Sequence, residues 1–172
     1  ERSAGKDFGD ASALACTIGE DYLARDLIPR MRQADGFIFG SPVFNLGYTS
    51  KFRTLFDRLR GGIRSGCFTN KPAGAVTAGA IPMGGQESCL ELMNMCIQDL
   101  EMIPVQWLNG APGVSGPSNG PLPAEDDGTQ IGLKNDRMAR FLSVLVGRRV
   151  AEVAVMQKLS KRHFNGLDKQ EF

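Results

Sequence analysis

One stretch, residues 34–52, most constrains what this chain can fold into, because it predicts a strand, a tight loop and a helix in immediate succession. Residues 37–39 form an uninterrupted apolar run closed by Gly40, which is typical of a parallel strand buried on both faces. Pro42 ends this strand because proline has no amide hydrogen to donate. The loop after it therefore lies at the carboxyl end of a strand, where open α/β sheets bind ligands.

The helix that follows is predicted from the spacing of its apolar side chains. They recur at i, i+3, i+4 and i+7, so that one face packs back on the sheet: Phe52, Leu55, Phe56 and Leu59. Thr49 or Ser50 is a suitable N-cap, because its hydroxyl can accept a hydrogen bond from a first-turn amide. We expect this helix to end near Arg60, where Gly61 and Gly62 begin a turn-rich connection.

A second unit of the same kind occupies residues 73–101. Residues 73–78 predict a strand of small side chains, which enters a glycine-rich loop and then a helix over residues 86–101. The helix carries one apolar stripe: Cys89, Leu92, Met93, Cys96, Ile97 and Leu100. Two such units in tandem require right-handed crossovers and imply a parallel sheet.

The remaining segments are predicted with less regular patterns. Residues 21–33 have helical character, with Pro29 either in a first turn or at a kink. Residues 103–108 predict a short third strand. Residues 109–134 are rich in Gly and Pro and predict a long loop of the kind that often forms a lid.

The C-terminal part predicts a closing helix capped by Asp136. Its expected buried side is apolar: Phe141, Leu142, Leu145, Val146, Val150, Val153 and Ala154. We predict one domain over residues 1–156 and a polar tail over residues 157–172.

Charge and cysteine usage exclude several classes of function. The formal net charge of +1 over 172 residues removes the electrostatic case for nucleic acid, and no apolar run is long enough to span a membrane. The four cysteines are scattered without a Cys-x-x-Cys pair, so we predict neither a metal site nor a disulfide framework, and a reduced, cytoplasmic protein. The sole histidine, His163, argues against a histidine-based catalytic triad.

At this point the motifs resemble a known family. Residues 34–58, with Gly40-Ser41-Pro42-Val43-Phe44, Ser50-Lys51 and Asp57-Arg58, resemble the second flavin loop of flavodoxin-like NAD(P)H-dependent FMN reductases. The similarity is to the iron-sulfur-flavoprotein and multimeric quinone-reductase branch. Residues 71–79 with Gly84-Gly85-Gln86-Glu87 resemble the third flavin loop, and residues 136–153 the last helix. The resemblance covers residues 34–156.

The resemblance implies a flavodoxin-like three-layer α/β sandwich with a parallel sheet of strand order 2-1-3-4-5. It also implies an oxidoreductase that uses FMN and NAD(P)H and passes hydride through bound FMN to free flavin, a quinone or another small acceptor. Relatives assemble as homodimers or homotetramers, so we expect the same here. No side chain is predicted as a catalytic acid or base, because hydride transfer depends mainly on positioning.

The expected cofactor site combines both loops. A flavin ring needs a flat slot that backbone amides can reach without bulky side chains. The candidate residues are, from the first loop, Ser41, Pro42, Val43, Phe44 and Asn45, and from the second, Ala78, Gly79, Ala80, Gly84 and Gly85. The amides of Val43, Phe44 and Asn45 are the predicted donors, and Phe44 or Tyr48 the predicted wall.

Two departures from the family pattern qualify this interpretation. No Ser/Thr-rich loop that would cradle the FMN phosphate precedes Ala34, so the first strand, first helix and second strand are expected either in upstream sequence or rearranged. Of the branch's cysteine cluster only Cys16 is present, so we predict no four-iron cluster. Two alternatives stay open, namely a one-electron carrier that never uses nicotinamide, and an interaction module that has lost its cofactor.

Overall fold

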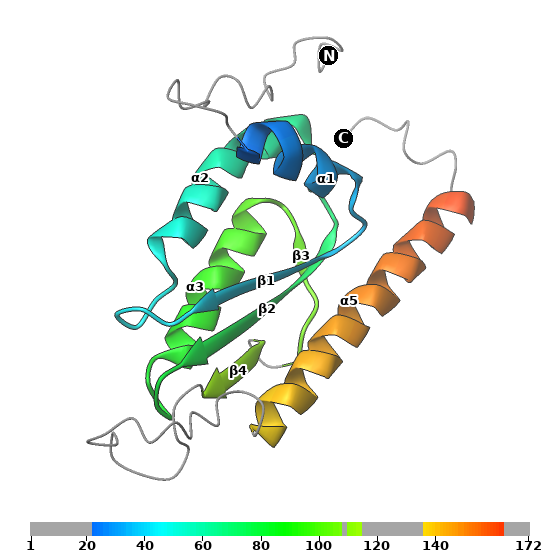
Figure 1. The fold of residues 1–172 in the computed structure, drawn as a ribbon. Helices are drawn as coiled ribbons and strands as arrows, with labels where there is room; N and C mark the ends of the chain where they lie inside the picture. The colour runs from blue at the N-terminus through cyan, green and yellow to red at the C-terminus, as the bar shows by residue number, and fades with distance from the viewer. Residues whose placement is uncertain (1–21, 108–109, 115–135, 164–172) are drawn as a thin grey trace.

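The computed structural model describes residues 22–107, 110–114 and 136–163, which form a parallel sheet between helices (Figure 1). The sheet contains four strands: β1 (Phe37–Pro42), β2 (Pro72–Gly79), β3 (Ile103–Pro104) and β4 (Ala111–Val114). β2 is central. It pairs with β1 on one side, from Phe37↔Ala73 to Pro42↔Ala78. On its other side it pairs with β3 along its amino-terminal part and with β4 along its carboxyl-terminal part.

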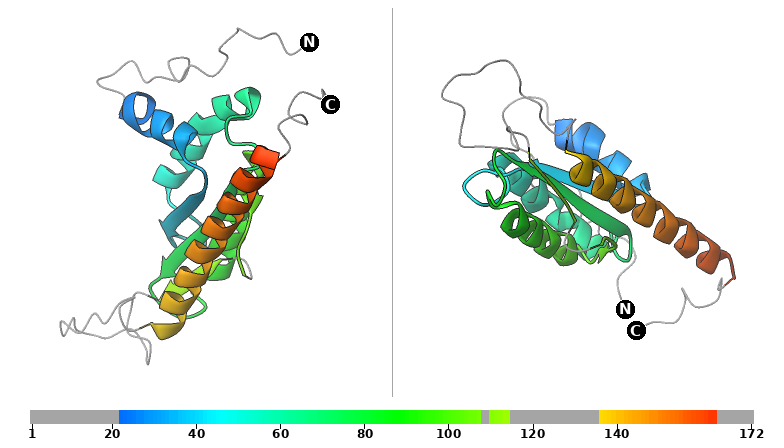
Figure 2. Two further views of the ribbon diagram at one scale, coloured as in Figure 1. Left: turned by 90° about the vertical axis from the view of Figure 1, so that its right-hand side faces the viewer. Right: turned by 90° about the horizontal axis from the view of Figure 1, so that it is seen from below.

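Helices lie on both faces of this sheet, as Figure 2 shows. α2 (Ser50–Ser65) and α3 (Gln86–Asp99) cover one face, and α5 (Arg137–His163) crosses the other. The chain reaches β1 through a π-helical turn, η2 (Leu23–Leu27), and α1 (Ile28–Gln33), whose first turn contains Pro29. The two predicted strand–loop–helix units and the parallel sheet are thereby confirmed.

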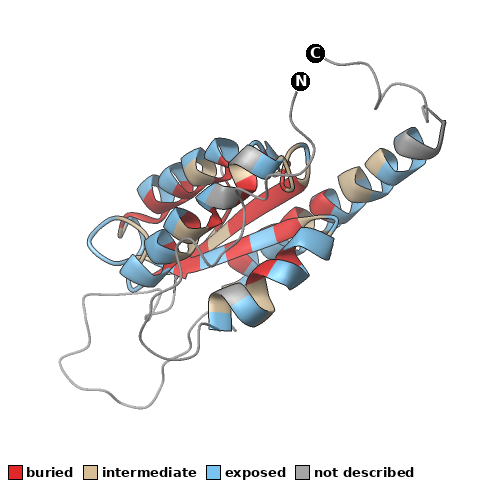
Figure 3. Ribbon diagram, turned by 90° about the horizontal axis from the view of Figure 1, so that it is seen from above, coloured by how far each residue is buried: buried red, intermediate tan, exposed pale blue. Residues whose placement is uncertain are grey.

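Buried residues of β1, α2 and α3 form the main core, and Figure 3 shows where the buried parts of the ribbon lie. Aromatic rings make up much of this core. The Phe39 and Phe56 rings lie 4.9 Å apart, and those of Phe52 and Phe56 lie 4.7 Å apart. The small residues of β2 let α5 approach from the other face, where a Cβ at Gly74 would lie 2.5 Å from Val146 Cγ1. This close packing explains why β2 carries so few large side chains.

β1 is not buried on both faces, contrary to the sequence prediction. Its residues alternate between buried and exposed, and Ile38 is 52% exposed. Among the described residues β1 pairs only with β2, so it lies at the edge of the sheet. α5 approaches β1 near Gly147, where an added Cβ would lie 3.7 Å from Ile38 Cδ1. The side of β1 that faces α5 is therefore only partly covered.

α2 confirms Thr49 as its N-cap, since the Thr49 hydroxyl accepts a hydrogen bond from the Phe52 amide at 3.3 Å. The predicted end near Arg60 is wrong, because the helix continues through its glycines to Ser65. Packing accounts for this, as a Cβ at Gly62 would lie 2.2 Å from Phe68 Cε2. The helix ends at Gly66, whose φ of 63° is left-handed.

The third strand position is divided between two short strands, where the sequence predicted one strand over residues 103–108 and a loop from residue 109. The side chain of Gln106 accepts a hydrogen bond from the Ala75 amide, in place of a backbone carbonyl. Gly110, with φ of 135°, allows the chain to return, because a Cβ there would lie 2.4 Å from the Ala75 carbonyl oxygen. Residues 115–134 of the predicted loop lie outside the described residues.

α5 begins as predicted, with Asp136 Oδ1 accepting a hydrogen bond from the Ala139 amide at 2.8 Å. Leu142, Val146 and Val150 are buried, but Phe141 is exposed, contrary to the prediction. The helix also continues to His163, into the segment predicted as a polar tail. Residues 164–172 lie outside the described residues.

Candidate functional site

The two predicted ligand loops lie side by side at the carboxyl edge of the sheet. The pairing of Pro42 with Ala78 brings their starting points together, and the Val43 amide donates to the Ala78 carbonyl at 2.8 Å. The loops also touch further out, because a Cβ at Gly85 would lie 2.8 Å from Leu46 Cα. All ten candidate residues therefore lie in the last residues of β1 and β2 or in the loops that follow these strands.

Ser41 lies beneath the first loop and holds its two ends together. The Ser41 hydroxyl donates to the Pro42 carbonyl at 3.0 Å and accepts from the Thr49 amide at 3.0 Å. Thr77 Oγ1, on β2, donates to the Ser41 carbonyl at 2.6 Å. Because Ser41 is buried and its hydroxyl is used within the loop, its contribution is to fix the loop's shape.

The first loop folds into a tight two-residue turn between Phe44 and Gly47. Their amides and carbonyls pair reciprocally, at 2.8 and 3.0 Å. Asn45 and Leu46, at the centre, have φ of 49° and 65°. Asparagine adopts this left-handed conformation readily, whereas Leu46 is strained by it. Of the three amides predicted as ligand donors, those of Val43 and Phe44 are already used within the protein, which leaves that of Asn45.

The second loop contains a turn closed by the Gly84 amide, which donates to the Ile81 carbonyl at 3.2 Å. Gln86, the first residue of α3, is buried and its Nε2 donates to the same carbonyl at 2.7 Å. Among the residues that the structure describes, the buried Gln86 Oε1 atom has no hydrogen-bond partner. Gly79 lies against this carboxamide, because a Cβ there would be 2.6 Å from Gln86 Nε2.

Gln86 is the site residue that the sequence analysis missed. Its position in the Gly84-Gly85-Gln86-Glu87 motif was visible, but nothing in the pattern indicated that its side chain would turn inward. A buried acceptor without a donor is costly, by about 1–3 kcal/mol. The unpaired oxygen therefore marks this loop as a place where a bound group can supply a hydrogen-bond donor.

Exposed apolar side chains surround the two loops. Phe44 is 63% exposed and Met83, whose φ of 54° is left-handed, is 91% exposed, while Leu46 and Ile81 are also exposed. Apolar side chains beside backbone polar groups suit a flat aromatic ligand with a polar rim. The arrangement therefore fits a ring system such as a flavin.

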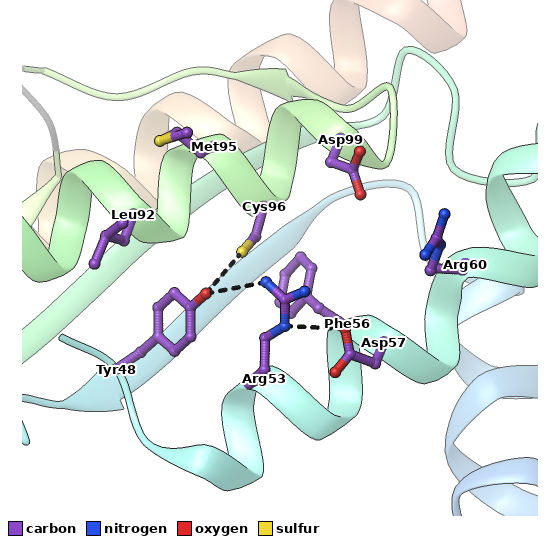
Figure 4. A pocket seen from close by; sticks show the side chains of 9 residues that line it. All are labelled: Tyr48, Arg53, Phe56, Asp57, Arg60, Leu92, Met95, Cys96 and Asp99. Atoms are coloured by element: carbon purple, nitrogen blue, oxygen red, sulfur yellow. Dashed lines mark hydrogen bonds and ion pairs between the residues drawn. The ribbon is translucent and has the colours of Figure 1, made fainter.

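A separate hollow of about 450 Å³ lies between α2 and α3, on the outer side of these helices (Figure 4). The Tyr48 hydroxyl accepts a hydrogen bond from Arg53 at 3.5 Å and lies 3.6 Å from Cys96 Sγ. The Arg53 hydrogen bond lowers the pKa of Tyr48, but burial and the Cys96 thiol together raise this pKa above its ordinary value. None of the ten candidate residues lines this hollow, and Tyr48 faces it from the end of the first loop.

The described residues contain neither a cluster of metal ligands nor a helix suited to a membrane. No three His, Cys, Asp or Glu side chains there lie close enough together to hold a metal ion. Of the helices described, none has the length and apolar character needed to cross a membrane. Cys16, which bears on the predicted absence of an iron–sulfur cluster, lies outside the described residues, so that absence stays a prediction.

The parallel sheet, its helices on both faces and the loop pair at its carboxyl edge define a flavodoxin-like α/β protein. The fold resembles that of RosB in its crystal structure with a bound 8-demethyl-8-formylriboflavin-5'-phosphate intermediate. The TM-score is 0.58 at 17% identity, over 99% of this chain and 69% of that one. At this identity the likeness concerns the fold alone.

Sequence comparison gives the family. The sequence model of the NADPH-dependent FMN reductases matches residues 7–109. The iron-sulfur flavoprotein MJ1083 of Methanocaldococcus jannaschii is 32% identical over 144 residues, which are 83% of this chain and 69% of that protein. An iron-sulfur flavoprotein of Methanosarcina thermophila is 33% identical over 79 residues, 44% of this chain and 39% of that protein. The chain thus belongs to the NADPH-dependent FMN reductase family.

Membership in this family makes the chain a flavin-dependent oxidoreductase with FMN and NAD(P)H as its cofactors, and it confirms the predicted resemblance. The region that the family model matches differs from residues 34–156, over which the sequence predicted the resemblance. It begins at residue 7, earlier than Ala34, and ends at residue 109, before the closing helix. The expected upstream strands and the FMN phosphate loop stay predictions.

Proposed function

We propose that the chain holds FMN at the carboxyl edge of β1 and β2 and passes reducing equivalents from NAD(P)H to free flavin, a quinone or another small acceptor. One observation carries this proposal, namely the contact between the tight turn at residues 44–47 and the glycine loop that precedes α3. When bound, FMN supplies the ring that takes hydride from NAD(P)H and returns electrons to an acceptor. The chain's own residues bind and orient that ring.

The two loops divide this task. The Asn45 amide and the backbone around Ala80 and Gly84 are the proposed contacts to the polar rim of the ring. Phe44 and Met83, which are exposed, are the proposed apolar walls that exclude water from it. Ser41, Pro42 and Val43 fix the first loop, while Ala78, Gly79 and Gly85 fix the second.

Gln86 is the proposed polar contact beneath the ring. Its Oε1 lacks a donor, and its Nε2 holds the Ile81 carbonyl, so a small movement of the loop would present the oxygen to a donor on the ligand. Because Nε2 already donates to the Ile81 and Gly113 carbonyls, the carboxamide would offer the ligand an acceptor only and would favour a ring edge that carries an N–H donor.

The decisive measurement is an absorbance spectrum of the purified protein with FMN, recorded before and after anaerobic addition of NADPH. Bound-flavin bands that bleach on addition would support the proposal. Bands that persist would favour the one-electron carrier. A protein that binds no added FMN would favour the interaction module and would contradict the proposed site.

Gln86→Leu tests the site within this assay. We expect FMN to bind about 10-fold more weakly, because one hydrogen bond to the ligand is lost. Gln98→Leu is the matched control, since Gln98 lies on the same helix but is exposed. Equal FMN affinity of the two variants would remove Gln86 from the site.

We also propose that the protein works as a homodimer or homotetramer in a reducing, cytoplasmic setting, on small-molecule substrates and without nucleic acid or membrane. The cysteines Cys67, Cys89 and Cys96 are free, which agrees with a reducing setting. The surface through which copies associate is argued below.

A further inference from the structure

α5 is apolar on two sides, although only one of them packs on the sheet. The inner side contributes Leu142, Val146 and Val150 to the core. The outer side carries exposed apolar residues toward both of its ends: Met138, Phe141, Val155, Met156 and Leu159. Phe141 is 55% exposed and Leu159 is 52% exposed. An exposed apolar side on a helix is typical of a surface that packs against another element or another molecule.

Within the described part of the chain, no element covers the outer side of α5. The views from below and from above show α5 on its own side of the sheet, with its C-terminal turns extending away from the strands (Figures 2 and 3). Two shallow hollows, of about 420 and 520 Å³, lie along the helix and share Arg148 and Glu152. Trp107, which is exposed, lines the first of them.

The outer residues follow a heptad spacing. Steps of three and four alternate along one seam: Met138, Phe141, Leu145, Arg148, Glu152, Val155 and Leu159. Leu145 is only half-exposed, because it also packs against the core cluster that contains Leu142 and Val146. This is the a/d pattern with which one α-helix packs along another. Only the two central positions are charged, and their side chains form an ion pair within the helix at 2.9 Å.

The order of these charges selects the partner and its direction. Consider a second copy of α5 that runs antiparallel to the first, with the two-fold axis at the level of Val150. A residue that lies a given number of positions before Val150 in one copy would then face the residue that lies the same number of positions after Val150 in the other copy. Arg148 of each copy would then face Glu152 of the other, which gives two central layers of opposite charge. In the same way Leu145 would face Val155, and Phe141 would face Leu159. A parallel pair in register would instead set Arg148 against Arg148 and Glu152 against Glu152, which is unfavourable.

We propose that two copies of this chain associate through an antiparallel α5–α5 seam, in which Arg148 of each copy pairs with Glu152 of the other. The interface is isologous, as expected of a two-fold dimer, because one seam is complementary to itself. The inference names a surface for the homo-oligomer proposed above, and it does not depend on bound flavin.

Two single charge reversals and their mixture test the seam. In the Arg148→Glu homodimer, glutamates would face each other at both central layers of the seam. In the Glu152→Arg homodimer, arginines would face each other at the same two layers. We expect each homodimer to dissociate about 100-fold more readily than the wild type, because like charges in an interface are strongly unfavourable. Mixing the two variants places unlike charges at both layers, so a one-to-one heterodimer should form.

Sedimentation velocity over a concentration series measures these equilibria. Lys51→Glu on α2 and Glu91→Arg on α3 are the charge-matched controls, since both side chains are exposed and lie outside the seam. Circular dichroism checks that each variant stays helical. A tetramer that splits into dimers in both single variants, and reforms on mixing, would equally support the seam.

Other outcomes would overturn the proposal. A wild-type dimer that neither reversal weakens would place the interface elsewhere, while leaving the homo-oligomer intact. A wild-type monomer at the highest attainable concentration would contradict both, and the outer side of α5 would then be covered by another segment or protein. FMN reduction by NADPH, measured in the same single variants, reports separately on the flavin proposal.

Discussion

The two strand–loop–helix units have the same order of parts, but their loops are held in different ways. The first loop is held by side-chain hydrogen bonds. The Ser41 hydroxyl accepts from the Thr49 amide, the Thr77 hydroxyl donates to the Ser41 carbonyl, and the Thr49 hydroxyl caps α2. The second loop depends on glycines and on one carboxamide, that of Gln86. Equivalent loops in the fold are therefore stabilised by hydroxyl hydrogen bonds in one unit, and by close packing at glycines together with one carboxamide in the other.

The difference bears on what each loop can do for a ligand. In the first loop the hydroxyl groups and most amides are used internally, so the loop presents a fixed shape. In the second, Met83 is exposed in a left-handed conformation and Gln86 Oε1 has no donor. We therefore expect the second loop to adjust when a cofactor binds, and the first to stay as it is.

The largest effect is expected where the two loops touch. Gly85→Ala places a Cβ at 2.8 Å from Leu46 Cα, and its φ of 96° is one that L-residues rarely adopt. We expect a loss of at least about 2 kcal/mol in the free energy of unfolding, together with weaker FMN binding, because both loops must move. Urea denaturation and FMN titration measure these losses.

Gly47→Ala is the matched control, because it lies in the opposite loop and its Cβ would meet only Leu92 Cδ1 at 3.5 Å. We expect its effect to stay within about 0.5 kcal/mol. If the two glycine variants were equally stable, the loops could not be in contact at Gly85.

A moderate effect is expected from Ser41→Ala in the braced loop. The variant removes the acceptor of the Thr49 amide and should cost about 1–2 kcal/mol in unfolding free energy. Ser143→Ala is the control, since the Ser143 hydroxyl only donates to a carbonyl of its own helix, that of Ala139. A Ser41 variant as stable as the control would show that the brace contributes nothing.

Sequence patterns predicted both units because their signals are local. The apolar run before Gly40, the helical spacing after Thr49 and the small residues of β2 each predicted one element, and all three elements are present. β1 is nevertheless buried on one face only, and α2 extends beyond its predicted end. The family resemblance then supplied the flavin, which periodicity alone could not have given. The candidate residues of the two loops do lie together, but their individual roles toward FMN stay predictions.

The errors have a common physical cause, which is that long-range packing decided the outcome. α2 continues through Gly62 because the distant Phe68 ring packs there, and Gln106 replaces a strand hydrogen bond that no local pattern encodes. Phe141 was assigned to the core because it is apolar, although its side of α5 faces away from the sheet. The inward turn of Gln86 likewise depends on Gly79, seven residues earlier.

The smallest effect is expected at Cys89 on α3, whose Sγ lies 3.5 Å from Thr77 Oγ1. Burial raises the pKa of the Cys89 thiol, and the Thr77 hydrogen bond offsets this only in part. A thiol whose pKa is raised by folding contributes its full stability below its unfolded pKa of about 8.5 and loses it as the pH rises through its folded pKa. Stability should therefore decline slightly as the pH rises from about 8.5 to the raised pKa of Cys89 in the folded protein.

Alkylation gives the same thiol a kinetic readout. Because only the thiolate reacts and Cys89 is fully buried, iodoacetamide should label it much more slowly than Cys96, which is half-buried and lines the hollow between α2 and α3. Peptide mass spectrometry over time distinguishes the two sites. In Gly85→Ala, labelling of Cys89 should accelerate because the second loop no longer closes over the start of α3. Equal rates at Cys89 and Cys96 in the wild type would mean that the packing around the start of α3 is already open.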